Sequence, residues 1–183
     1  WQIVYRGVPN SGYTAQPKEC INYVSVHDNH TLWDCIQARA PYHTPGRSPQ
    51  TATLQERVQM QNMAIGIIGL SQGIPLFHAG VDMLRSKSGD SDSYNSGDWF
   101  NRLDFSYETN NWGVGLPIAE KNGEAWGFWK TRLADSTLKP GKEHILACVR
   151  HFQTILRIRK SSPLFRLRSA EEVSRRVRFL NAE

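Results

Sequence analysis

Two short β-prone segments with a helical segment between them constrain the fold of this chain most strongly. Residues 21–26 follow the breaker Pro17 and are rich in Ile and Val, and residues 73–80 form a second apolar run bounded by glycines. Between them, Thr53 with Glu56 three residues later predicts a capped helix start. The apolar residues that follow at helical spacing are Met60, Met63, Ala64, Ile67 and Ile68. This order predicts a βαβ unit with a parallel sheet, and one apolar helix face against the core.

A long connection and a second helix follow the second strand. Residues 81–142 are rich in Gly, Asn, Asp, Ser and aromatic residues, and they are longer than a structural connection requires. They are therefore expected to be functional. A helix is predicted after Pro140-Gly141, with its apolar stripe formed by Ile145, Cys148, Val149, Phe152, Ile155 and Leu156. The polar and apolar alternation of residues 176–180 predicts a strand.

The polar cluster His27-Asp28-Asn29-His30 stands directly after the first strand. In parallel sheets, functional groups gather at the C-terminal ends of the strands. We therefore expect His27, Asp28 and the loop from Val81 to share one face. The alternative is that Asp28 and Asn29 only cap the following helix.

Composition limits the classes of function. The chain has 183 residues, of which 39% are hydrophobic, enough for the core of one domain, and no apolar run approaches the roughly 20 residues of a membrane-spanning helix. Three cysteines without C-x-x-C spacing favour a reducing compartment. The net charge of +5 is concentrated in residues 157–178, which favours a solvated helix end, with a nucleic-acid-binding module as the alternative.

The start at Trp1 and the strand-like end lead us to expect a piece of a longer chain.

The two strand segments and the long loop resemble a known family. The strings Ile21-Asn22-Tyr23-Val24-Ser25-Val26-His27-Asp28-Asn29 and Gly73-Ile74-Pro75-Leu76-Phe77-His78-Ala79-Gly80 resemble the seventh and eighth barrel strands of the α-amylase-like glycoside hydrolases. In the loop, Leu84-Arg85-Ser86-Lys87-Ser88 and Asp92-Ser93-Tyr94-Asn95-Ser96-Gly97-Asp98-Trp99-Phe100-Asn101-Arg102 are similar to pullulanases and limit dextrinases, the starch-debranching members. Further strings, at residues 110–117 and 161–167, extend the match from about Ile21 to Phe179. The sequence of the last helix and the C-terminal tail is most similar to that of the plant and algal limit dextrinases.

This resemblance implies an α/β fold, the C-terminal part of a (β/α)8 TIM barrel followed by the start of a β-sandwich domain. Residues 1–168 would hold strands seven and eight, the substrate loop and the last helix, and residues 169–183 would begin the β domain. It implies hydrolysis of α-1,6-glucosidic linkages in pullulan, amylopectin and limit dextrins with retention. The family's nucleophile and acid/base lie on earlier strands, so the fragment alone is expected to be inactive.

The resemblance also assigns residues. Asp28 is the transition-state stabiliser that contacts the sugar at the cleavage point, and His27 and Asn29 bind the same sugar. Trp99 is a candidate for stacking on glucose, although core packing is the more common role for such a tryptophan, and the same holds for Trp112. Glu124 takes the place of a family acidic residue that contacts the neighbouring sugar.

One position departs from the family pattern. Ser91 stands where the family has an arginine that reaches the same sugar, and a serine is too short for that contact. A catalytically inactive α-glucan-binding or regulatory relative is therefore the alternative function. No nucleic acid, membrane or organic cofactor is implied, and no metal site is predicted, with a structural calcium ion left open. Plastid location follows from the resemblance alone.

Overall fold

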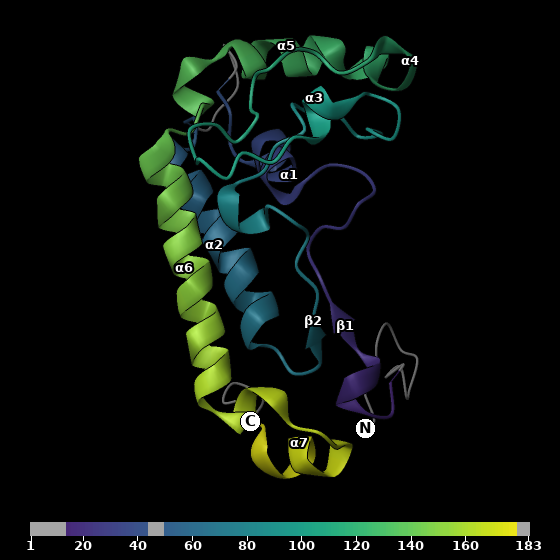
Figure 1. The fold of residues 1–183 in the computed structure, drawn as a ribbon, viewed down its shortest axis with the longest axis vertical. Coiled ribbons are helices and arrows are strands. Elements are labelled where there is room, and N and C mark those ends of the chain that lie inside the picture. The colour runs from purple at the N-terminus through teal and green to yellow at the C-terminus, as the bar shows by residue number, and fades with distance from the viewer. Residues whose placement is uncertain (1–13, 44–49, 179–183) are drawn as a thin grey trace.

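The computed structural model describes residues 14–43 and 50–178, and it is mostly helical with a small parallel sheet (Figure 1). The strands are β1 (Ile21–Asn22) and β2 (Ile74–Pro75). The helices are α1 (Leu32–Arg39), α2 (Leu54–Leu70), α3 (Asp98–Asn101), α4 (Ala119–Asn122), α5 (Trp126–Ala134), α6 (Lys142–Ser161) and α7 (Ala170–Arg176). Short 3-10 turns are η1 (Pro17–Glu19), η2 (Val81–Met83), η3 (Gly123–Ala125), η4 (Ser136–Leu138) and η5 (Pro163–Arg166).

The predicted parallel pairing of the two strand segments is confirmed. Ile21 pairs with Ile74 and Asn22 with Pro75. The amides of Ile74 and Leu76 donate to the carbonyls of Cys20 and Asn22, both at 2.8 Å, so the missing N–H of Pro75 falls between two donors and costs no bond in this ladder. Both strands are shorter than predicted, because the ladder ends where the two segments turn into loops.

Helix α2 begins as predicted but buries only part of the predicted face. Thr53 and Glu56 form the capping box. Of the predicted apolar face, Ile68 is buried and Met60 and Ala64 are half-buried, but Met63 and Ile67 are exposed, so the prediction is correct only in part. The buried positions of α2 are Arg57, Val58, Gln61, Ile65, Ile68 and Gly69. Two of the buried side chains are polar and are held by tertiary hydrogen bonds: Arg57 donates to Ala52, Gln37 and Pro41, and Gln61 donates to the carbonyl of Val81.

The long helix α6 lies along α2 and fixes the position of β2 (Figure 1). Its buried residues include Ile145, Cys148, Val149 and Ile155, as predicted, although Leu156 is exposed. A Cβ at Gly69 would lie 2.2 Å from the Ile155 side chain, so the close approach of the two helices requires glycine there. Arg159 donates to the carbonyls of Gly69, Ser71 and Gly73, which satisfies the C-terminal end of α2 and the turn into β2. This arginine of the basic stretch is therefore structural.

Two expectations along the chain are corrected. The connection between β2 and α6 is not simply a loop, because it contains α3, α4 and the nine-residue helix α5, whose Trp129 packs edge-on against Trp112 in the core. A strand was expected from about Ser169, but Ala170–Arg176 is a helix, capped by the Ser169 side chain at the amide of Glu172. Phe179 and Leu180 of the predicted strand lie outside the described residues. Among the described residues, no helix is long and apolar enough to cross a membrane.

Candidate functional site

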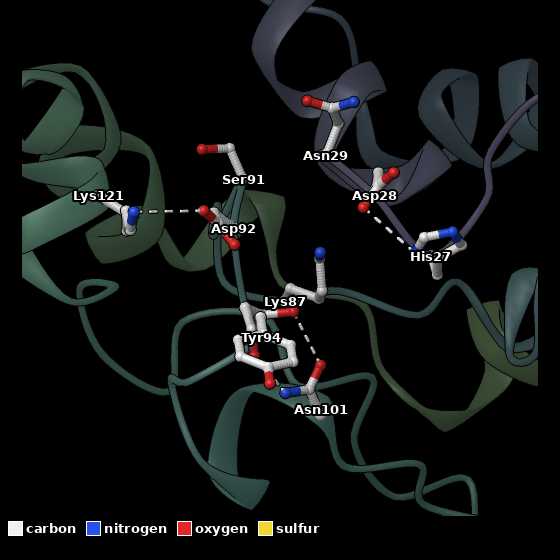
Figure 2. Close-up of a pocket in the computed structure, with 10 residues that line it drawn as sticks. His27, Asp28, Asn29, Lys87, Ser91, Asp92, Tyr94, Asn101 and Lys121 are labelled. Atoms are coloured by element: carbon white, nitrogen blue, oxygen red, sulfur yellow. Dashed lines mark hydrogen bonds and ion pairs between the residues drawn. The ribbon is translucent and has the colours of Figure 1, made fainter.

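The candidate site lies at the C-terminal edge of the parallel strand pair. The segment that leaves β1 carries His27, Asp28 and Asn29, and the segment that leaves β2 carries Lys87 and Ser91. These two segments line a common hollow of about 610 Å³, which confirms the expectation that they share one face. Its lining is His27, Asp28, Asn29, Lys87, Ser91, Asp92, Ser93, Tyr94, Asn101 and Lys121 (Figure 2).

His27 and Asp28 form one wall of the hollow as a contacting pair. The Nδ1 atom of His27 lies 3.2 Å from a carboxylate oxygen of Asp28, and both side chains are largely exposed to solvent. Asn29 has a φ of 62°, in the left-handed region that asparagine tolerates better than most residues. The turn at Asn29 leads the chain away from the hollow and into α1.

The side chain that caps α1 belongs to Thr31, whose hydroxyl accepts from the amide of Asp34. The alternative interpretation, in which Asp28 and Asn29 cap this helix, is therefore wrong. Asp28 is left with an exposed carboxylate on the hollow.

A buried carboxylate joins α1 to the segment after β2. Asp34 accepts from the hydroxyl of Ser86 at 2.6 Å and from the amide of Lys87 at 2.8 Å. Burial raises the pKa of the Asp34 carboxyl, while these hydrogen bonds oppose that rise. Asp34 thus fixes the distance between the two walls of the hollow.

A second buried carboxylate shapes the opposite wall. Asp90 accepts from the amide of Asp92, the side-chain amide of Asn122 and the hydroxyl of Ser96. Both the amide and the hydroxyl of Ser91 donate to the side-chain oxygen of Asn122, each at 3.0 Å. Asp90 and Asn122 therefore hold Ser91 and Asp92 in place at the rim.

Six residues that sequence reasoning did not single out also line the hollow: Lys87, Asp92, Ser93, Tyr94, Asn101 and Lys121. Tyr94 is 97% exposed, and its ring stands at the edge of the hollow. Asn101 exchanges hydrogen bonds with Ser93, through its amide to the Ser93 carbonyl and from the Ser93 hydroxyl to its side-chain oxygen, both at 2.9 Å. Tyr94 and Asn101 both lie in residues 92–102, the loop sequence that resembles pullulanases and limit dextrinases. Nothing in the sequence distinguishes these two residues from their neighbours as site residues.

Two predicted site residues lie outside this hollow. Trp99 is 59% exposed, so it is not a core residue, but it borders a neighbouring hollow that shares only Asn101 with the first. Glu124 lines another hollow of about 370 Å³, which shares Ser91 and Lys121 with the first. The structure thus brings together His27, Asp28 and Asn29, and places Trp99 and Glu124 in adjoining hollows.

The lining of the hollow suits a ligand rich in hydroxyl groups. The carboxylates of Asp28 and Asp92 only accept hydrogen bonds, the ammonium groups of Lys87 and Lys121 only donate, and the amides of Asn29 and Asn101 do both. A hydroxyl group both donates and accepts, so each one can bridge an acceptor and a donor. In the part of the chain that the structure describes, no three His, Cys, Asp or Glu residues come together as metal ligands.

His78, which follows β2, is expected to stay neutral at physiological pH. Burial, followed by the positive charge of Arg85, lowers its pKa from 6.5 to about 4. Because arginine can only donate, the Nε2 atom 3.2 Å from the Arg85 guanidinium must be the acceptor. The stability that neutral His78 contributes is present above pH 6.5 and is lost as the pH falls from 6.5 toward 4. Its ring proton shifts in NMR spectra should titrate near pH 4, and a midpoint near 6.5 would contradict this geometry.

Comparison with known proteins gives consistent matches. Residues 107–183 match the family model described as alpha-1,6-glucosidases, pullulanase-type, C-terminal. The chain is 53% identical over 169 residues to "Pullulanase 1, chloroplastic" of Arabidopsis thaliana, and 42% identical over 180 residues to a pullulanase of Klebsiella aerogenes. These matches cover 92% and 98% of this chain but only 17% and 16% of the relatives.

Solved structures give the same match. The apo pullulanase of Klebsiella pneumoniae superposes with a TM-score of 0.76 at 41% identity, over 88% of this chain and 16% of that chain. The same enzyme in complex with maltotriose gives the same score and identity, over 88% of this chain and 14% of that chain. The chain therefore spans less than a fifth of each of these relatives.

Proposed function

Since the chain is homologous to the pullulanases over nearly all of its length, we propose that it is one wall of the sugar site of a starch-debranching enzyme. The whole enzyme would hydrolyse α-1,6-glucosidic linkages in pullulan, amylopectin and limit dextrins with retention. The observation that carries this proposal is the hollow in which His27, Asp28 and Asn29, after β1, face the loop after β2. This is where a parallel α/β fold gathers its functional groups.

The proposed architecture is the C-terminal part of a (β/α)8 barrel. Strands β1 and β2 are parallel, α2 lies between them in the chain, and α6 packs on α2. This arrangement supports two successive strand–helix units, which would be the seventh and eighth units of the barrel. Residues 169–183 would lead into a β-sandwich domain. Helix α7 occupies Ala170–Arg176, so the first strand of that domain would begin after it.

Asp28 is proposed to stabilise the transition state. Glycoside hydrolysis passes through an oxocarbenium-like sugar, and hydrogen bonds to ring hydroxyls that tighten at that point lower the barrier by several kcal/mol. An exposed carboxylate at the strand end supplies both an acceptor and a negative charge. His27 and Asn29 would hold hydroxyls of the same sugar, and Glu124 and Trp99, in the adjoining hollows, would contact neighbouring units. The nucleophile and the acid/base would come from outside these 183 residues.

Two findings about relatives support the substrate and the location. A related pullulanase has been solved with maltotriose, which is an α-glucan. A relative with 53% identity is named as chloroplastic, which supports a plastid location for the protein that carries this chain. No cofactor is proposed.

Hydrolysis of pullulan by the full-length protein tests the function. We expect the release of maltotriose as the main product, detected by chromatography, and the new reducing end should form first as the α-anomer, which NMR reads as retention before mutarotation. Ser91, whose hydrogen bonds go to Asn122, favours a second candidate, an inactive glucan-binding relative. A full-length protein that binds maltotriose but releases none from pullulan would favour this second candidate over the first.

A further inference from the structure

Lys87 is the most deeply buried charged residue of the hollow. It is only 1% exposed, yet it lines the hollow, and its backbone amide is anchored on Asp34 at 2.8 Å. Lysine is almost never fully buried unless its ammonium is paired. In Figure 2 its ammonium points into the space between Asp28 and Asp92.

The ammonium of Lys87 has no partner within the described part of the chain. No carboxylate oxygen of a described residue lies within 4.0 Å of it, and its side chain donates no hydrogen bond to one. Asp34 and Asp90 are the nearby buried carboxylates, but they accept from Ser86, Asn122 and backbone amides instead. The three donors of the ammonium are therefore available to a ligand in the hollow.

We propose that Lys87 is a substrate-binding residue that donates hydrogen bonds to the hydroxyl oxygens of a glucose unit in this hollow. The inference rests on the proposed function and names a contact that the sequence did not indicate. Asp28 and Asp92 only accept hydrogen bonds, whereas Lys87 only donates, so a hydroxyl between them can donate to a carboxylate and accept from the ammonium. The buried stem of Lys87 keeps the ammonium in one place, which lowers the entropy lost when sugar binds.

The positive charge of Lys87 indicates that it acts in substrate binding and not in stabilising the transition state. The transition state carries positive charge at the anomeric carbon. A second positive charge directly beside that carbon would destabilise it, so Lys87 is placed on hydroxyls remote from the reacting bond. Such a contact is equally strong with substrate and transition state, and its loss raises KM with kcat unchanged.

The test is steady-state hydrolysis of pullulan by the full-length enzyme. We expect Lys87→Met, which keeps the length and apolar character of the stem, to raise KM about tenfold or more with kcat within about twofold, because hydrogen bonds to charged groups are the stronger ones. Lys130→Met on α5 is the matched control, since Lys130 is exposed and outside the hollow, and it should leave both constants unchanged. An unchanged KM in Lys87→Met, or a loss confined to kcat, overturns the proposal.

A second variant separates binding from folding. Lys87→Arg keeps the positive charge near Asp34 and Asp90 but moves the donors, so it should keep the melting temperature and raise KM by less than Lys87→Met does. If Lys87 only balanced these buried carboxylates, Lys87→Arg would match the wild type in KM, which also overturns the proposal.

Calorimetric binding of maltotriose distinguishes this proposal from the proposed function. A wild-type protein that is inactive on pullulan, yet binds maltotriose more tightly than Lys87→Met does, refutes the hydrolytic function and supports the role of Lys87. A wild-type protein that hydrolyses pullulan, with equal maltotriose affinity in both proteins, supports the function and refutes the role of Lys87.

Discussion

Asp28→Asn is expected to nearly abolish pullulan hydrolysis by the full-length enzyme. In the role proposed for Asp28, its negative charge stabilises the positive charge of an oxocarbenium-like sugar, and asparagine keeps the shape of the side chain but removes this charge. A loss of about 3 kcal/mol or more of transition-state stabilisation corresponds to a fall in kcat of about 100-fold or more. Steady-state kinetics on pullulan measure this change.

Asp92→Asn is the matched control for this substitution. Asp92 is a carboxylate of the same hollow, exposed like Asp28, and it forms a 3.9 Å ion pair with Lys121. Exposed ion pairs contribute about 0–1 kcal/mol, and a hydroxyl contact made equally with substrate and transition state acts on KM, so this control should raise KM but change kcat by only a few fold. Melting temperatures of both variants should match the wild type, because both side chains lie at the surface. An Asp28→Asn variant that retains normal kcat contradicts the role of Asp28.

The position of the site could be predicted because it follows from the direction of the strands. Once residues 21–26 and 73–80 are parallel strands, the segments after them must leave the sheet at the same edge. This argument placed His27, Asp28 and the loop from Val81 together, and the shared hollow confirms it. The capping box of α2 and the start of α6 after Pro140-Gly141 were also predictable, because helix starts depend on residues adjacent in the sequence.

Features that depend on tertiary partners could not be predicted. Arg57 and Gln61 of α2 are buried because distant carbonyls accept from them, so periodicity of apolar residues identified only part of the buried face. The burial of Lys87 likewise depends on the approach of α1 through Asp34. The sequence around residue 99 did not indicate which aromatic side chain would line the hollow. Tyr94 lines it, whereas Trp99 borders a neighbouring hollow.

Gly89→Ala is expected to damage both the fold and the site. Gly89 has a φ of 78°, and a Cβ on it would lie 2.5 Å from the ring of Trp129. Trp129 is buried and packs against His30, Trp112 and Phe128, so its ring cannot move aside cheaply. Backbone strain of about 1–2 kcal/mol and overpacking of about 1–3 kcal/mol together predict a loss of about 2–5 kcal/mol in stability. Calorimetric melting of the full-length enzyme checks this.

Gly97→Ala is the control that separates the backbone strain from the collision with Trp129. Gly97 has nearly the same φ, 79°, in the same loop, but nothing lies within 4 Å of the position of its Cβ. The ψ of Gly97 is 175°, a conformation almost restricted to glycine, so the control carries backbone strain of about 1–3 kcal/mol without the collision. Because Gly89 stands between Lys87 and Ser91, Gly89→Ala should also raise KM for pullulan at temperatures where the enzyme remains folded. Equal melting temperatures for the two variants would show that Trp129 does not fix this segment against α5.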